Sequence, residues 1–276
     1  MSPEGPVAII GLGLMGGSLA RDLAEQGIEV LGFDRQNAVL EAARRSRIIE
    51  RSLPEDLSGL DAARMVVVAT PVDAAASSLP AIAQHSHPDA VITDVGSTKR
   101  DILGAAADAG LENRFIGSHP LAGDHRSGWN ATRTHLYEGA TVFVCPGPAT
   151  DSATLEAVSS LWRRVGARPV RQDAAEHDRI MATISHLPQA VATALATVMI
   201  RGGFTGSDLG PGGRDMTRLA DSSAEMWSAI SLANSDNLAT ALESLENTLS
   251  DLRKQLASGD RDRLRDFFEA GRKLKE

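Results

Sequence analysis

The hydrophobic pattern of the chain changes once, near residue 171, and this change divides it into two predicted domains. In residues 1–170, short apolar runs alternate with stretches such as 18–26 and 37–46, whose apolar positions recur at helical spacing. The run 65–69 is apolar throughout, which is typical of a strand buried on both faces of a parallel sheet. The runs predicted as strands are 7–10, 28–33, 65–69, 90–94, 114–117 and 141–144, with 167–170 as an additional edge strand. Strands interleaved with helices predict the α/β class, with a Rossmann-type doubly wound parallel sheet.

Residues 171–276 show helical spacing almost throughout. The stretch 176–199 predicts one long helix interrupted only by Pro188, which we expect to kink it, and a loop rich in glycine and proline follows over 202–213. Six leucines then fall at alternating spacings of four and three: Leu238, Leu242, Leu245, Leu249, Leu252 and Leu256. This stripe is the pattern of a helix packed lengthwise on another helix. We expect an all-α domain that binds substrate and forms a homodimer, with packing inside one subunit as the alternative for the stripe.

Composition and charge exclude several classes of partner. The chain of 276 residues carries a formal net charge of −8 and has no basic block, so a nucleic-acid partner is not expected. Its single cysteine, Cys145, excludes an internal disulfide and lies in an apolar run, where a buried strand residue is expected. The strand pattern begins almost at the first residue, and no apolar run approaches the roughly 18 residues that span a membrane. We therefore expect a cytoplasmic protein with no membrane partner.

A glycine-rich segment between the first strand and the first helix predicts a dinucleotide site. Its residues are Gly11, Leu12, Gly13, Leu14, Met15 and Gly16. The first glycine permits a tight turn, the second lets the backbone approach a pyrophosphate, and the third lets the helix pack closely on the strand. Asp34 ends the second strand, where a carboxylate accepts hydrogen bonds from the adenosine ribose. That charge repels a 2′-phosphate and favours NAD, whereas Arg35 could pair with the phosphate and leaves NADP open.

Two further loops lie at the carboxyl ends of predicted strands. Thr70 and Pro71 follow the strand at 65–69, and Val95, Gly96 and Ser97 follow the next one. An open α/β sheet places its ligand at this edge. We expect these loops to line the nicotinamide half of the cofactor.

One histidine, His119, stands among small residues in the segment 115–123, after a predicted strand. A dehydrogenase that oxidises an alcohol needs a group to take the hydroxyl proton while hydride leaves for the nicotinamide. An imidazole near its ordinary pKa suits that task. Taken alone, His119 has the alternative of a histidine satisfied by nearby backbone.

Taken together with the glycine fingerprint and with Gly96-Ser97-Thr98-Lys99, the segment around His119 resembles the prephenate/arogenate dehydrogenase family, from about residue 7 to residue 256. The resemblance implies oxidative decarboxylation of prephenate to 4-hydroxyphenylpyruvate, with hydride transfer to NAD, in tyrosine biosynthesis. It implies that His119 accepts the proton of the ring hydroxyl and that Ser97 binds the same hydroxyl. No metal is needed for this chemistry.

The resemblance also implies a set of substrate-binding residues. Because the substrate carries two carboxylates, the family grips one of them with an arginine that matches Arg218, and Arg214 is the alternative. The other matched positions near the pocket are Asp215, Trp227, His186 and Gln189.

Substrate choice depends on one group, because prephenate carries a keto oxygen where arogenate carries an ammonium. His125 favours prephenate, although the neighbouring Asp124 would suit an ammonium. The alternatives are an arogenate dehydrogenase, a dual-specificity cyclohexadienyl dehydrogenase and a non-catalytic NAD-responsive binding module. The joint presence of Ser97, His119 and Arg218 argues against the last, and the absence of lysine from 176–199 argues against a β-hydroxyacid dehydrogenase.

Overall fold

A computed structural model of the chain describes residues 5–123 and 126–275. Its strands form one sheet in the order β3-β2-β1-β4-β5-β6-β7-β8. The strands are β1 Val7–Ile10, β2 Val30–Phe33, β3 Arg51–Ser52, β4 Met65–Val68, β5 Val91–Asp94, β6 Phe115–Pro120, β7 Thr141–Pro146 and β8 Arg168–Arg171. The order reverses between β1 and β4, which creates the crevice where doubly wound sheets bind nucleotides. The α/β class and the Rossmann-type half of the prediction are confirmed.

The sheet is mixed: the predicted parallel arrangement holds from β3 to β6, whereas β7 and β8 run in the opposite direction. β7 runs antiparallel to β6, with His119 opposite Phe143. The described part of the connection between these strands contains only the short 3₁₀ turn Trp129–Ala131 in place of a crossover helix. Without such a helix the chain returns in the opposite direction, as antiparallel neighbours do.

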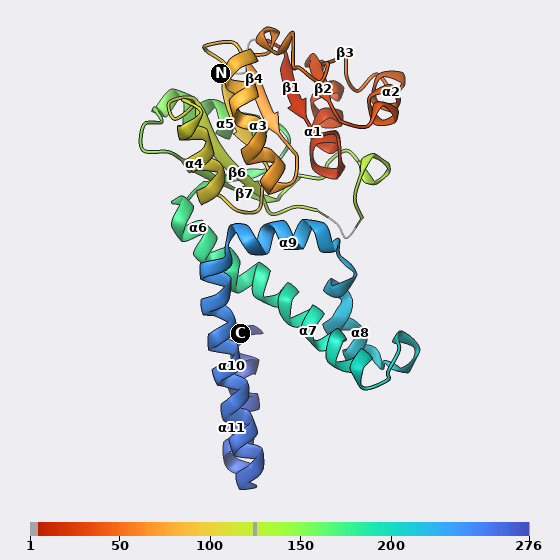
Figure 1. Cartoon of the computed structure of the whole chain (residues 1–276), viewed down its shortest axis with the longest axis vertical. Helices are drawn as coiled ribbons and strands as arrows, with labels where there is room; N and C mark the ends of the chain where they lie inside the picture. The colour runs from red at the N-terminus through yellow and green to blue at the C-terminus, as the bar shows by residue number, and fades with distance from the viewer. Residues whose placement is uncertain (1–4, 124–125, 276) are drawn as a thin grey trace.

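Helices cover both faces of the sheet (Figure 1). They are α1 Leu14–Glu25, α2 Asn37–Arg45, α3 Val72–His85, α4 Arg100–Asp108 and α5 Ser152–Arg164. Alternate residues of β1 separate two cores: Val7 and Ile9 pack with α1 and α5, whereas Ala8 and Ile10 pack with α3 and α4. This burial on both sides explains the uninterrupted apolar character of the central strands.

Beyond β8 the described chain is helical. The elements are α6 Ala174–Met181, the π turn Ala182–His186, α7 Leu187–Arg201, α8 Pro211–Thr217, the 3₁₀ turn Arg218–Asp221, α9 Ala224–Ala233, α10 Ser235–Ser258 and α11 Arg261–Arg272. The irregularity expected around Pro188 takes the form of the π turn, and the proline itself lies in the first turn of α7, where its missing N–H is tolerated. Ile230 of α9 is buried in the core beneath α3 and α4 and docks the helical part on the sheet.

The far end of the helical part leaves apolar side chains exposed. α10 and α11 project away from the sheet (Figure 1), and all six leucines of the stripe lie on α10. Leu238, near the start of α10, is buried, whereas Leu249 is 52% exposed and Leu256 is 60% exposed. A single subunit therefore covers only part of the stripe.

One continuous helix, residues 174–201, is long and apolar enough to cross a bilayer by length and composition alone. The apolar runs of the sequence predict no such segment, because scattered polar residues break every run, although the mean hydropathy over a longer window remains high. A core helix of a soluble protein passes the same test, so the finding is weak support for a membrane. Only 17% of the apolar window is buried within the subunit, so this helix adds to the uncovered apolar surface.

Candidate active site

The glycine fingerprint has the geometry of a pyrophosphate cradle. Gly11 has φ +97°, and a Cβ there would lie 2.6 Å from the carbonyl oxygen of Ala69. A Cβ on Gly16 would lie 1.9 Å from the carbonyl oxygen of Gly11, so the start of α1 must pack on the loop without a side chain. At Gly13, in contrast, a Cβ would meet no atom of the described residues within 4 Å. The loop is therefore tight on its protein side and open beside the N-terminus of α1, which fits a dinucleotide phosphate.

Asp34 is fixed beside this loop. Its carboxylate accepts hydrogen bonds from the backbone N–H groups of Leu12 and Gln36, both at 2.9 Å. Each oxygen keeps a lone pair that can accept from a ribose hydroxyl. Arg35 is exposed next to it, and Met15 lies in the first turn of α1.

The two loops predicted for the nicotinamide half lie at the carboxyl edge of the sheet. Thr70 and Pro71 connect β4 to α3, and the Thr70 hydroxyl is buried without a hydrogen-bond partner among the described residues. Val95 and Gly96 are buried after β5, and Ser97 is half-buried. The glycine cradle, the fixed Asp34 and these loops together fit NAD.

The sequence predicts His119 after a strand, whereas the structure places it inside β6. Only 9% of the residue is exposed. Burial lowers the pKa of His119 well below the usual 6.5, and the electrostatic interaction with the neighbouring His177, Lys99 and His186 side chains lowers it further. The imidazole is therefore neutral at neutral pH. A neutral imidazole at this edge can accept a proton from a bound substrate.

A buried ion pair joins the Ser97 loop to the His119 strand. Lys99 Nζ donates to the carboxylate of Asp94 and, at 2.8 Å, to the carbonyl oxygen of Ser118. Asp94 also accepts from Gly96 N at 2.7 Å and from Ser118 N at 2.9 Å. Sequence reasoning gave neither charged residue a role. Two opposite charges flanking a Gly-Ser loop between a strand and a helix were the available signal.

A second pair of residues, His177 and Asp178, was also missed. His177 Nε2 lies 2.9 Å from His119 Nδ1, and His177 Nδ1 lies 2.8 Å from Asp178 Oδ1. Both side chains are fully buried, although they come from α6 in the helical part. Their only sequence signal was a polar His-Asp step at the start of an apolar helix.

His186 and Trp227 present two unpaired donors next to one another. Asn234 Nδ2 lies 3.2 Å from His186 Nδ1 and donates to it, which leaves the proton of the neutral ring on Nε2. Burial lowers the pKa of His186 to about 4, so the ring is neutral. Its Nε2 and the indole Nε1 of Trp227 have no partner among the described residues, and the two rings lie 5.9 Å apart. Two donors of this kind can bind a carbonyl or carboxylate oxygen.

The other predicted substrate residues are less closely joined to His119. Gln189 is buried and donates from Nε2 to the carbonyl oxygen of Leu219 at 2.8 Å, which ties α7 to the turn that carries Arg218. Arg214, Asp215 and Arg218 are exposed on α8 and this turn, and the structure shows no contact between them and His119. His125 and Asp124 lie outside the described residues.

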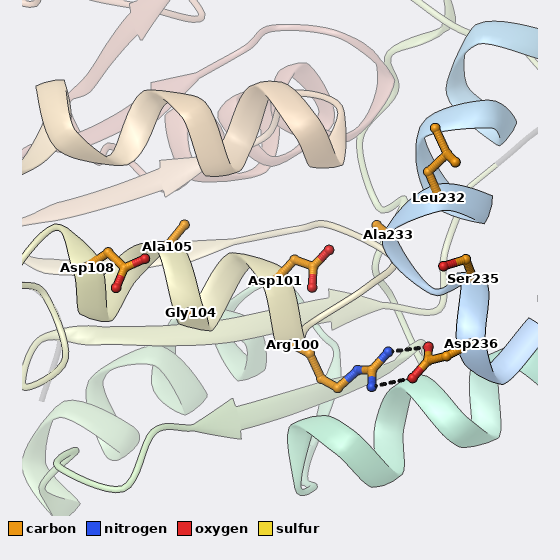
Figure 2. A pocket seen from close by; sticks show the side chains of 9 residues that line it. All are labelled: Arg100, Asp101, Gly104, Ala105, Asp108, Leu232, Ala233, Ser235 and Asp236. Atoms are coloured by element: carbon orange, nitrogen blue, oxygen red, sulfur yellow. Dashed lines mark hydrogen bonds and ion pairs between the residues drawn. The ribbon is translucent and has the colours of Figure 1, made fainter.

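A groove separates α4 from the junction of α9 and α10 (Figure 2). Arg100 crosses it and forms two hydrogen bonds with Asp236, at 2.8 and 2.5 Å. This pair is a further link between the sheet and the helical part, besides the packing of Ile230 and the contact of His119 with His177.

Comparison with known proteins agrees with this geometry. The family model for the nucleotide-binding domain of prephenate dehydrogenase matches residues 19–171, and the model for its dimerisation domain matches residues 173–270. The prephenate dehydrogenase of Bacillus subtilis (strain 168) is 31% identical over 283 residues, covering 98% of this chain and 75% of the relative. The cyclohexadienyl dehydrogenase of Zymomonas mobilis is 28% identical over 278 residues, covering 98% of this chain and 94% of the relative.

Solved structures give the same result. Prephenate dehydrogenase from A. aeolicus, in complex with hydroxyphenyl propionate and NAD+, superposes with a TM-score of 0.91 at 30% identity, covering 98% of this chain and 97% of that one. Arogenate dehydrogenase from Synechocystis gives a TM-score of 0.84 at 27% identity, covering 98% of each chain. Together the two family models cover both parts of the chain, and a relative at 31% identity covers 98% of it. This chain therefore belongs to the prephenate dehydrogenase family.

Proposed function

We propose that the protein catalyses the NAD-dependent oxidative decarboxylation of prephenate to 4-hydroxyphenylpyruvate. The observation that carries this proposal is the neutral, buried imidazole of His119, placed next to the Ser97 loop at the nucleotide-binding edge of the sheet. The relatives named for this activity cover nearly the whole chain, and a similar structure holds NAD+ and a hydroxyphenyl compound.

In this reaction His119 takes the proton of the ring hydroxyl, and the oxygen keeps the bonding pair and becomes a carbonyl. The ring carbon loses hydride with its two electrons to the nicotinamide, which is the chemistry that bound NAD supplies. The bond to the ring carboxylate then breaks, carbon dioxide leaves, and the released pair aromatises the ring. The phenol oxygen recovers a proton from His119. The protein therefore has to orient the hydroxyl, which is the role of Ser97, and to keep His119 neutral.

The unpaired donors favour prephenate over arogenate. His186 Nε2–H and Trp227 Nε1–H suit a keto or carboxylate oxygen, whereas an ammonium needs acceptors. A dual-specificity enzyme remains the second candidate, because relatives named for arogenate and cyclohexadienyl substrates cover the chain equally well. Arg218 is the proposed clamp for a substrate carboxylate, with Arg214 as the alternative.

The uncovered apolar surface of α7 and α10 supports a homodimer formed by the helical part. The described chain exposes Val198 to 65%, Ile200 to 70% and Leu256 to 60%. Exposed patches of this kind mark association surfaces. We also propose a cytoplasmic location, because a second subunit would cover this apolar surface without a membrane.

Initial rates with prephenate and arogenate, each with NAD and NADP, test the proposal directly. We expect NADH formation that requires prephenate, and a preference for NAD. His119→Asn should keep NAD affinity and lose at least about 10²-fold in kcat, the usual scale for losing a general base. Turnover above a tenth of wild type in this variant would show that another group takes the proton.

A further inference from the structure

A chain of three buried side chains leads from His119 across the boundary between the sheet and the helical part. It runs from His119 through His177 to Asp178, with hydrogen bonds of 2.9 and 2.8 Å, and none of the three residues is more than 9% exposed. His119 uses one ring nitrogen, Nδ1, in these hydrogen bonds, whereas His177 uses both of its ring nitrogens. The positions of the protons along this chain decide which nitrogen of His119 is free to act as a base.

The far end of the chain is an ionised carboxylate. Asp178 accepts hydrogen bonds from Lys99 N at 2.8 Å and Arg100 N at 2.9 Å, at the N-terminus of α4, where the helix dipole favours an anion. Burial raises the pKa of Asp178, but the hydrogen bonds from His177, Arg100 and Lys99 outweigh it and hold the pKa below its usual value. Asp178 therefore only accepts hydrogen bonds.

The proton positions follow from this end inward. His177 must donate its Nδ1–H to Asp178, and a neutral His177 then carries a lone pair on Nε2. That lone pair can only accept, so His119 must donate from Nδ1. The neutral ring of His119 is left with a free lone pair on Nε2, the atom that has no role in the chain.

We propose that His177 and Asp178 are positioning residues that hold His119 in the Nδ1–H tautomer and so make Nε2 the proton acceptor. When Nε2 takes the substrate proton, the imidazolium keeps its Nδ1–H bond to His177, and the charge of Asp178 stabilises it. The same logic governs the histidine of serine hydrolases, where a carboxylate selects the tautomer. This inference rests on His119 being the base of the proposed reaction.

The arrangement makes the base depend on contact between the two parts of the chain. His119 and the N-terminus of α4 belong to the sheet, whereas His177 and Asp178 belong to α6. Asn234 also holds α6, because its Nδ2 donates to the carbonyl oxygen of Asp178 at 2.7 Å. The Arg100–Asp236 pair, visible in Figure 2, closes the same boundary from outside. The correct tautomer is thus available only when the helical part is docked.

The tautomer itself can be observed without turnover. In protein with ¹⁵N-labelled histidine at neutral pH, the His119 ring should carry its proton on Nδ1 and show a bare Nε2, with the signals assigned by their loss in His119→Asn. If His177 were instead an imidazolium, it would donate to His119 and place the His119 proton on Nε2. A protonated Nε2 in the neutral His119 ring overturns the proposal, whatever the substrate.

The pH profile of kcat/KM tests the charge of Asp178. Lys99, His177 and His186 face His119 with positive or potentially positive charge, Asp94 pairs with Lys99, and Asp178 acts through His177. Asp178→Asn can still accept from His177 but has lost its charge, so the acid limb should move to lower pH by about one unit, with a lower plateau in kcat.

The matched control is Asp101→Asn, which makes the same change at an exposed carboxylate in the first turn of α4, the helix whose N-terminal N–H groups Asp178 accepts from (Figure 2). It should leave the acid limb in place. Equal shifts in both variants, or no shift in Asp178→Asn, would overturn the proposed role of His177 and Asp178.

His177→Phe removes the link while keeping a ring beside Phe143. We expect kcat to fall at least about tenfold, with the KM values for substrate and NAD changed less than about twofold. If His177 had only a structural role, the variant would change KM or the stability of the protein and would keep the kcat of the wild type. Should the Phe variant fail to fold, the tautomer measurement and Asp178→Asn decide the question. If His119→Asn kept its activity, His119 would not be the base of the reaction. The tautomer measurement would still show whether His177 and Asp178 hold His119 in the Nδ1–H form.

Discussion

Replacing Lys99 by methionine should destabilise the protein more than any other lysine substitution in the described chain, because its ammonium and the Asp94 carboxylate are both fully buried. Removing one partner of a buried pair leaves the other charge without compensation, at a cost of about 3–5 kcal/mol. Asp94 keeps the N–H groups of Gly96 and Ser118, so we expect the lower end, about 3 kcal/mol. Against a typical total stability of about 5–15 kcal/mol, that loss is large.

The matched control is Lys254→Met. Lys254 pairs with Asp251 at 2.9 Å, but both side chains are more than 60% exposed, and such pairs contribute about 0–1 kcal/mol. Urea unfolding followed by circular dichroism should separate the two variants clearly. The double variant Asp94→Asn with Lys99→Met should lose less than the sum of the single variants, because it leaves no unpaired charge. Equal losses in Lys99→Met and Lys254→Met would refute the reasoning.

Four further outcomes are expected. Asp34→Ser should narrow the preference for NAD over NADP several-fold in kcat/KM, because the repulsion of a 2′-phosphate is removed; an unchanged ratio would mean that Asp34 does not face the ribose. Arg218→Ala should raise KM for prephenate at least about tenfold, and an unchanged KM would move the carboxylate clamp to Arg214. We expect the proposed homodimer to become a monomer in sedimentation experiments when Leu249→Glu and Leu256→Glu are combined, and a dimer that survives both substitutions would place the interface elsewhere. Because burial lowers the pKa of His186 to about 4, the free energy of unfolding should be highest above pH 6.5 and fall by up to about 3 kcal/mol toward pH 4. In urea unfolding across that range, the free energy of unfolding of His186→Gln should depend less on pH.

The sequence was sufficient to predict the strands that are buried on both faces. The limits of β1 agree with the prediction residue for residue, because a buried parallel strand is apolar at every position and is bounded by a glycine loop. β3 was missed, since two residues at a sheet edge carry no periodicity. The direction of β7 was also beyond reach, because direction is decided by the connection and not by the strand's own residues.

For the candidate site, motifs could be recognised but long-range pairs could not. The glycine cradle and Asp34 follow from local spacing and lie where expected. His177 is 58 residues from His119, and no local pattern indicates that α6 lies against β6. The roles expected for His119, Ser97 and Arg218 remain predictions, which the proposed variants test.

The π turn at Ala182–His186 has a consequence for how this helix tolerates change in length. A π turn holds one more residue than an α turn, and each residue of a helix advances its direction by about 100°. Because the π turn takes up its additional residue within one wide turn, deleting a single residue here would restore a regular turn and leave Gln189 in nearly its present direction relative to His177. The same deletion in a regular α-helical turn would rotate every later residue by about 100°. This segment is therefore a place where the helix should lose a residue with its two ends still aligned, whereas its regular turns should not.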